Sequence, residues 1–330
     1  MPATRLCAPA RRAPARYATN KRSEHGEGKA MSGETVGFIG LGAMGTGMAK
    51  RLVAAGFDVA GTDVRGEAVA AFAAAGGRAA ASPAEAASGA DVLFVMVVNA
   101  AQADAVLFGE NGAVGALPRG SVVVLNSTVP ASAAAALADR LAETGHPMLD
   151  APVSGGTVGA EGGTLTVMAS GPDEAFAKAG PALDAVAKKV YRLGDKAGIG
   201  STVKTVNQLL AGVHIAAAAE AMALGTRAGA DPRTLFEVIS NSAGNSWMFS
   251  NRVPHMLEGD YTPLSAVDIF VKDLGLVLDT GRELKFPLPL AAAAHQLFLM
   301  AAAAGLGRED DAAVVKVFER LAGISVSGGS

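Results

Sequence analysis

The stretch Thr35-Val-Gly-Phe-Ile-Gly40-Leu-Gly-Ala-Met-Gly45 decides the fold that we predict for this chain. An apolar run with strand composition leads directly into spaced glycines, and residues 48–52 after them have helical composition. A glycine triplet alone is weak evidence, but the order strand, triplet, helix is the context of a dinucleotide-binding turn. In such a turn Gly40 permits the tight bend, Gly42 lets a pyrophosphate approach the backbone, and Gly45 lets the helix pack on the strand. A glycine-rich turn without a ligand is the alternative, and it does not explain that order.

An acidic residue follows the second predicted strand, residues 57–62. Asp63 is placed to bond a ribose 2′-hydroxyl, and its charge would repel the 2′-phosphate of NADP. We therefore expect NAD as the cofactor, with NADP less favoured. Arg65 lies close by and works against that preference, because a guanidinium can bind the 2′-phosphate.

Strands and helices alternate through the first half of the chain. Residues 91–98 and 121–125 are continuous apolar runs, as expected of parallel strands that are buried on both faces. Alanine-rich segments with helical composition separate such runs, and the pattern after Gly225 is helical almost throughout. The sequence predicts an α/β fold: an N-terminal Rossmann-like doubly wound sheet, a long bridging helix and an all-α C-terminal domain. The expected bounds are 34–196 for the NAD-binding domain, 197–226 for the bridging helix and 227–330 for the C-terminal domain.

The first 33 residues are excluded from this fold prediction. They are rich in arginine and poor in acids, which is the composition of a transit peptide, but their prolines argue against an amphipathic helix. Met31 begins a typical domain start. We interpret the segment as disordered or as an error in the assigned start site.

Composition limits the classes of function. The chain has 330 residues, of which 50% are hydrophobic, and a net charge of −3, so nucleic acid and anionic membranes are not expected as partners. The only cysteine is Cys7, which excludes an intrachain disulfide or a cysteine-based metal site, and we expect no metal. His214 and Glu220 interrupt the most apolar run, so we expect a buried helix there and a cytoplasmic protein.

Two further segments have the composition of ligand-binding sites. Ser154-Gly155-Gly156 exposes consecutive backbone amides that can bind an anion such as a substrate carboxylate, although a simple hairpin is the alternative. After Gly198, Lys204 and Asn207 lie three residues apart at a predicted helix start, which Ser201 or Thr202 could cap, and therefore share one face. A surface lysine and a solvated amide are the alternative for this pair.

Three polar features lie in the predicted helical region. Asn245 stands in a polar cluster beside the only tryptophan, Trp247. Lys272 lies one turn after Asp268, which also fits a surface ion pair. Asp310 and Asp311 precede a helix, and we interpret them as caps.

With these residues assembled, the chain resembles the β-hydroxyacid dehydrogenases of the 3-hydroxyisobutyrate dehydrogenase family. The resemblance covers residues 35–321 and rests on four motifs in order. The motifs are Gly40-Leu-Gly-Ala-Met-Gly45, Asp150-Ala-Pro-Val-Ser-Gly-Gly156, Gly198-x-Gly-x-x-x-Lys204-x-x-Asn207 and Lys272-Asp273. One departure concerns Asn207, where we expect histidine in some enzymes that act on threonate.

The resemblance implies NAD-dependent oxidation of a small hydroxy acid, and we expect L-threonate to give 2-dehydro-L-erythronate. A 3-hydroxyisobutyrate dehydrogenase, a tartronate semialdehyde reductase and a non-catalytic dinucleotide-binding protein are the alternatives. The resemblance implies Lys204 as the general acid/base and Asn207 as a second catalytic residue that orients the substrate, and we expect a homodimer or homotetramer. The residues expected to bind cofactor are Gly40, Leu41, Gly42, Ala43, Met44, Gly45, Asp63, Val97, Asn99, Thr128 and Lys272. Those expected to bind substrate are Ser154, Gly155, Gly156, Lys204, Asn207 and Asn245.

Lys204 needs a lowered pKa for this chemistry, because a free lysine, with a pKa of about 10.4, stays protonated near pH 7. We expect burial, the positive end of the helix, the nicotinamide ring and Lys272 to lower it.

Overall fold

A computed structural model describes residues 34–327 of the chain, and the expectations for residues 1–33 lie outside that range. The main sheet has six parallel strands in the order β3-β2-β1-β4-β5-β6. This order reverses between β1 and β4, which opens a crevice beyond the carboxyl ends of those strands. The strands are β1 Thr35–Ile39, β2 Asp58–Thr62, β3 Arg78–Ala79, β4 Val92–Val95, β5 Val122–Leu125 and β6 Met148–Asp150.

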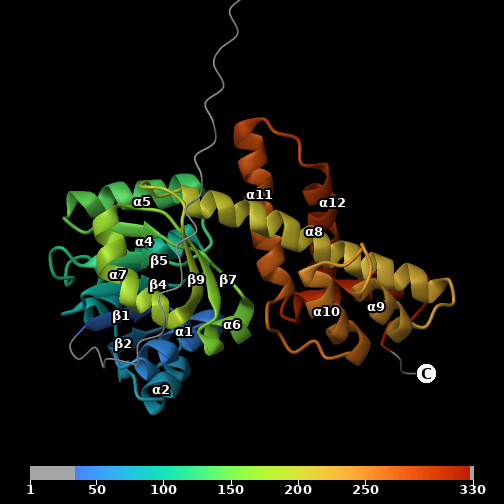
Figure 1. Cartoon of the computed structure of the whole chain (residues 1–330), viewed down its shortest axis with the longest axis horizontal. Helices are drawn as coiled ribbons and strands as arrows, with labels where there is room; N and C mark the ends of the chain where they lie inside the picture. Colours follow the sequence, from blue (N-terminus) through green and yellow to red (C-terminus); the bar gives the residue numbers. More distant parts are fainter. Residues whose placement is uncertain (1–33, 328–330) are drawn as a thin grey trace, which may run out of the picture. The chain divides into compact units, whose positions relative to one another are not determined.

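The central strands are buried because helices cover the sheet on both faces. Phe38 of β1 and Phe94 of β4 are register partners, and their rings stack with centroids 5.6 Å apart. Both side chains are fully buried. The covering helices are α1 Ala43–Ala54, α2 Gly66–Ala74, α3 Pro83–Ala87, α4 Ala100–Phe108, α5 Ala131–Glu143 and α7 Asp173–Val186 (Figure 1).

A second, three-stranded sheet follows, in the order β7-β8-β9. Strand β7 (Val153–Ser154) pairs antiparallel with β8 (Leu165–Ala169), and β9 (Ala187–Arg192) pairs parallel with β8. A short helix, α6 (Gly156–Gly162), connects β7 to β8. The sequence predicted none of α2, β3 and α6; of these, β3 has only two residues and α6 only seven.

Helix α8 (Ile199–Arg227) is a single helix that contacts β6, β8 and α5 near its start and α9 to α13 beyond (Figure 1). Its residues Ile215 and Met222 are fully buried in the core of the helical region. The fold class predicted from the sequence is confirmed. The remaining helices are α9 Pro232–Ser240, α10 Trp247–Glu258, α11 Val267–Leu284, α12 Pro289–Ala301, the π-helix η1 Ala302–Leu306, the 3-10 helix η2 Asp311–Val314 and α13 Val315–Ala322.

Two helical stretches, Ile199–Arg227 and Pro289–Leu306, are long and apolar enough to cross a membrane by composition alone. The core helix of a soluble protein has the same composition. Both stretches supply fully buried residues to the helical core, including Ile215 and Phe298, as core helices do.

Candidate active site

The glycine triplet forms a tight turn between β1 and α1. Gly40 has φ +98°, and a Cβ there would lie 2.2 Å from the carbonyl oxygen of Met96. A Cβ on Gly45 would lie 1.9 Å from the carbonyl oxygen of Gly40, so neither position accepts a side chain. Gly42, by contrast, caps α1 and faces open space. The turn therefore leaves room for a ligand only at Gly42, where the free amides of α1 begin, beside Leu41, Ala43 and Met44.

Asp63 fastens this turn from the end of β2. Its Oδ2 accepts a hydrogen bond from the amide of Leu41 at 2.8 Å, and its Oδ1 accepts from Nε of Arg65 at 3.0 Å. Partial burial acts to raise the pKa of Asp63, but the bonds from Arg65 and Leu41 outweigh it and hold the pKa below its usual value. The guanidinium of Arg65 also donates to the carbonyl of Leu41 at 3.0 Å. The side chains of Asp63 and Arg65 are thus bound to each other, so they do not act as two competing ligands for the cofactor.

Two loops at the carboxyl ends of β4 and β5 lie beside the turn. The amide of Val97 donates to Oγ of Ser127 at 2.8 Å, which joins the two loops. Asn99 caps α4 through a bond from the amide of Gln102. The carbonyl of Thr128 accepts a bond of 3.4 Å from Nζ of Lys272, so α11 reaches this edge of the sheet.

The predicted substrate loop leads into α6. Ser154 ends β7, and Gly155 and Gly156 have φ values of +136° and +64°. A Cβ on Gly156 would meet open space, so the loop is uncovered on that side. Helix α6 packs against α1, where a Cβ on Gly47 would lie 2.9 Å from the amide nitrogen of Glu161. This packing places the loop and the glycine turn on neighbouring elements.

Asp150 holds the start of α8 against the sheet. Its carboxylate accepts bonds from the amides of Gly198 and Ser201, each at 2.8 Å, and from Oγ of Ser201 at 2.7 Å. The sequence predicted a side-chain cap by Ser201 or Thr202, which is wrong: the helix begins at Ile199, and neither hydroxyl caps it. The hydroxyl of Ser201 instead donates to the carboxylate that satisfies the helix start.

Gly200 explains the close approach of α8 to the strands. A Cβ at Gly200 would lie 2.4 Å from the carbonyl oxygen of Met168 and 2.5 Å from that of Asp150. Only glycine fits between these two backbone oxygens, so the second glycine of the Gly198-x-Gly200 pair sets the helix position.

Lys204 is buried, with 7% of its surface exposed, and its amine lies inside a chain of polar groups. Its Nζ donates to Oε1 of Gln208 at 2.8 Å, and Nδ2 of Asn207 donates to the same oxygen at 3.0 Å. The predicted pair Lys204 and Asn207 therefore meets at a third residue of the same helix.

The polar chain continues from α8 to α11. Nε2 of Gln208 donates to Oδ2 of Asp273 at 2.5 Å, and Oδ1 of Asp273 lies 2.6 Å from Nζ of Lys272. A Cβ on Gly212 would lie 2.9 Å from the side chain of Leu274, so Gly212 lets α11 approach α8 closely one turn further on. Lys272 pairs with Asp273 rather than with Asp268.

Burial lowers the pKa of Lys204 to about 8. The charge of Asp273 acts in the opposite direction, and the charge of Lys272 lowers the pKa further. A lysine with this pKa is partly neutral near physiological pH and can accept a proton.

Comparison with known proteins places these features in a family. The profile described as the NAD binding domain of 6-phosphogluconate dehydrogenase matches residues 35–194, and the profile described as NAD-binding of NADP-dependent 3-hydroxyisobutyrate dehydrogenase matches residues 198–318. The L-threonate dehydrogenase of Cupriavidus necator is 65% identical over 72% of this chain and 80% of its own length. The chain belongs to the 3-hydroxyisobutyrate dehydrogenase family.

Solved structures of this family agree with the fold. The crystal structure of 3-hydroxyisobutyrate dehydrogenase from Salmonella typhimurium is 52% identical, with a TM-score of 0.82 over 86% of this chain and 100% of that chain. A structure of Psf3 in complex with NADP+ and 2-OPP is 26% identical, with a TM-score of 0.79 over 86% of this chain and 99% of that chain. The protein is therefore an NAD-dependent hydroxyacid dehydrogenase, and its substrates are small hydroxy acids.

The predicted substrate residue Asn245 lies outside the polar chain around Lys204. Its amide donates to the carbonyl of Ser240, and its Oδ1 accepts from Ser250, all within the turn between α9 and α10. Helix α9 packs at the far end of α8, about 30 Å along the axis from Lys204.

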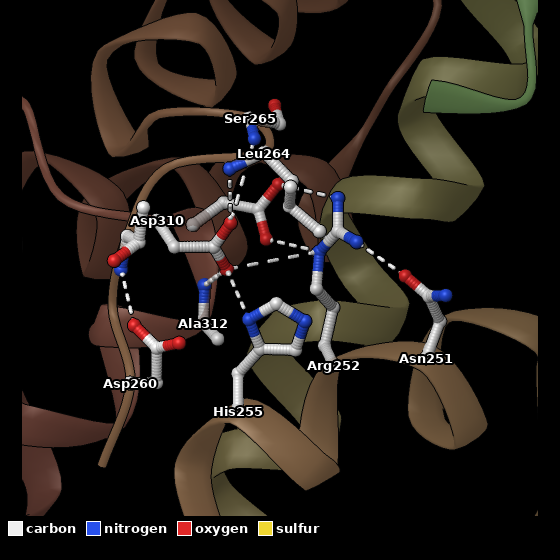
Figure 2. Close-up of polar contacts among 10 residues, drawn as sticks. Asn251, Arg252, His255, Asp260, Leu264, Ser265, Asp310 and Ala312 are labelled. Carbon is white, nitrogen blue, oxygen red and sulfur yellow. Dashed lines mark hydrogen bonds and ion pairs between the residues drawn. The ribbon is translucent and has the colours of Figure 1, made fainter. Parts of the chain in front are cut away.

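Asp310 caps η2, as predicted, through a bond from the amide of Ala312. Asp311, which was also predicted to be a cap, instead accepts two bonds from the guanidinium of Arg252, at 2.5 and 3.1 Å. Figure 2 shows the guanidinium of Arg252 beside Asp310 and Asn251, with His255 directed at Asp310. Arg252, Asp310 and Asp311 are buried, and their contacts join α10 to η2.

Three residues that shape the site were given no role from the sequence: Gln208, and Asp150 and Asp273, which stand in two of the quoted motifs. Gln208 was open to prediction, because position i+4 lies on the same helix face as Lys204. Asp150 binds Ser201, which lies 51 positions along the chain, and Asp273 binds Gln208, which lies 65 positions away. No local sequence pattern reveals such contacts.

Proposed function

We propose that the protein oxidises L-threonate to 2-dehydro-L-erythronate, with Lys204 as general acid/base. The observation that carries this proposal is the burial of Lys204 at the start of α8, with its pKa lowered to about 8. The substrate follows from the L-threonate dehydrogenase of Cupriavidus necator, at 65% identity.

The proposed chemistry needs a base at the substrate hydroxyl. When bound, NAD accepts the hydride from the carbon that carries this hydroxyl. The neutral amine of Lys204 takes the hydroxyl proton, and in the reverse direction its ammonium returns it. Asn207 donates its second amide hydrogen to a substrate hydroxyl and fixes its direction. Ser154, Gly155 and Gly156 hold the carboxylate through backbone amides, which the open face of the loop supports.

The residues around the glycine turn fit a dinucleotide. Gly42 faces open space at the start of α1, which supports a pyrophosphate beside the helix amides. Arg65 is held by Asp63 and by the carbonyl of Leu41, which supports NAD over NADP. We propose that the cofactor is bound by Gly40, Leu41, Gly42, Ala43, Met44, Gly45, Asp63, Val97, Asn99, Thr128 and Lys272.

We also propose that the chain works in the cytoplasm as a homodimer or homotetramer. We further propose the domain bounds 34–196 and 227–330, joined by residues 197–226. Apolar side chains exposed on α8 and near the start of α12, such as Val206, Leu210 and Leu290, support self-association.

A substrate screen tests the reaction. NADH formation is followed with L-threonate, erythronate, 3-hydroxyisobutyrate and glycerate, and NADH consumption with tartronate semialdehyde. We expect the highest kcat/KM with L-threonate. Good turnover of 3-hydroxyisobutyrate with none of the C4 sugar acids would favour the second candidate, which rests on the Salmonella typhimurium structure. Cofactor binding without turnover of any of these compounds would favour a non-catalytic protein.

A further inference from the structure

The side chain of Gln208 connects the amine of Lys204 to the carboxylate of Asp273. Both ends of its amide are in use: Oε1 accepts from Lys204 at 2.8 Å, and Nε2 donates to Asp273 at 2.5 Å. All three side chains are buried, with exposures of 7%, 8% and 3% for Lys204, Gln208 and Asp273. Both bonds therefore lie in a largely buried environment.

The carboxylate decides which way the amide points. An ionised carboxylate only accepts hydrogen bonds, so the amide end that faces Asp273 must be the NH2 group. The carbonyl oxygen of Gln208 is then directed at Lys204, where it accepts one N–H of the amine. With one N–H fixed, the remaining positions of the amine, including its lone pair when neutral, are restricted in direction.

The amide also separates two charges. The Gln208 amide lies between Asp273 and Lys204, and Nζ of Lys272 lies 2.6 Å from the other oxygen of Asp273. A direct ion pair between Asp273 and Lys204 would keep the amine protonated near neutral pH, which defeats its use as a base. Insertion of an uncharged amide prevents that pairing.

We propose that Gln208 and Asp273 are positioning residues: Asp273 orients the Gln208 amide, and the amide directs the Lys204 amine and keeps it from pairing with Asp273. This inference rests on the proposed role of Lys204 and adds to it how the amine is held. The charged groups that face Lys204 from the packed elements are Asp273 and Lys272 of α11. Asp150 of β6 binds the helix start at Ser201.

Two single-charge variants test the proposal, because they are expected to move one pH profile in opposite directions. Gln208→Glu places a carboxylate beside Lys204 and should shift the acid limb of kcat for L-threonate oxidation up by about 1–2 pH units. Asp273→Asn removes the attracting charge and should shift that limb down by about 1 unit. Asp273→Glu keeps the charge and should leave the limb near its wild-type position.

Matched controls carry the same chemical changes outside the site. Gln296 lies on the exposed side of α12, and Asp279 lies on α11 beyond the site. The variants Gln296→Glu and Asp279→Asn should both leave the pH profile of kcat unchanged. NADH binding, measured by fluorescence, reports whether each variant is folded. If both site variants fold and their limbs stay in place or move in the same direction, the positioning role is wrong.

The Lys204→Ala variant distinguishes a failure of the positioning inference from a failure of the proposed function. A Lys204→Ala protein that turns over L-threonate normally overturns the general acid/base assignment itself. An inactive Lys204→Ala protein together with unmoved limbs in Gln208→Glu and Asp273→Asn overturns only the positioning inference.

Discussion

The carboxylate of Asp150, the last residue of β6, accepts hydrogen bonds from both the amide and the hydroxyl of Ser201 in the first turn of α8. A negative charge at a helix start is favourable, because the first amides have no partner within the helix. Burial nevertheless raises the pKa of Asp150, against the bonds from Ser201 and Gly198. The helix that carries Lys204 is thus anchored to the sheet by one carboxylate.

We expect Asp150→Asn to destabilise the protein by about 2–4 kcal/mol, because buried hydrogen bonds to a charged group are lost and an amide hydrogen then faces the donors. Urea denaturation measures this change. Turnover should also fall, since Lys204 lies one turn further along the same helix. Asp184→Asn, on the exposed side of α7, should change neither quantity. Unchanged stability in Asp150→Asn would mean that Asp150 is not the anchor.

A second prediction concerns Gly200, which lies against two backbone oxygens. Gly200→Ala should displace the start of α8, because its Cβ would lie 2.4 and 2.5 Å from carbonyl oxygens that belong to the strands. We expect a loss of stability of about 1–3 kcal/mol and a lower kcat. Gly180→Ala is the matched control: it lies within α7 and its Cβ meets no atom beyond its chain neighbours, but Pro181 follows and opposes the helical gain of alanine, so it should change stability by less than about 1 kcal/mol. Equal thermal shifts in the two variants would contradict this account.

The sequence predicted those parts of the site that are written in local patterns. The glycine turn is recognisable because the strand, the glycines and the helix follow one another along the chain. Lys204 and Asn207 are recognisable because helical spacing puts them on one face. The contacts of Asp150 and Asp273 were not predicted, because the fold and not the local sequence brings them to α8. The cap of α8 was assigned to Ser201 or Thr202 for the same reason: a hydroxyl at a helix start is the usual cap when no distant carboxylate is known.

Lys204 gives a prediction about pH. For the wild-type enzyme, kcat for oxidation should rise with pH through a midpoint near 8, because the amine must lose its proton to act as base. Lys204→Ala should lower kcat by about 100-fold or more, with NADH binding nearly intact. Lys204→Arg should be equally poor, because a guanidinium stays protonated. A pH profile of kcat for wild type that is flat between pH 6 and pH 10 would exclude this lysine as the base.

The pairing of Asp63 with Arg65 gives a prediction about cofactor preference. Asp63→Ala releases the guanidinium from its bond of 3.0 Å, and a free arginine there can bind the 2′-phosphate of NADP. We expect the ratio of kcat/KM for NAD to that for NADP to fall by about tenfold or more, which corresponds to about 1.4 kcal/mol. The double variant Asp63→Ala with Arg65→Ala should lose the gain with NADP. A ratio that stays at the wild-type value would show that this pair does not select the cofactor.

Arg252 forms ion pairs with the carboxylates of Asp311, at 2.5 Å, and of Asp310, at 4.0 Å; Figure 2 shows it beside Asp310. Burial raises the pKa of Asp311 to about 6 even with the guanidinium beside it. Arg252→Met leaves that carboxylate without its cation, and we expect a loss of about 3–5 kcal/mol of unfolding free energy at pH 7.5. The loss should shrink as the pH falls toward 6, because without Arg252 the pKa of Asp311 lies higher still, so the variant takes up a proton first and the buried charge disappears. Arg282→Met, which breaks an exposed pair on α11, should cost less than about 1 kcal/mol at either pH. Denaturation at pH 7.5 and pH 5.5 distinguishes the two variants, and a loss in Arg252→Met that does not depend on pH would show that Asp311 is not the group left uncompensated.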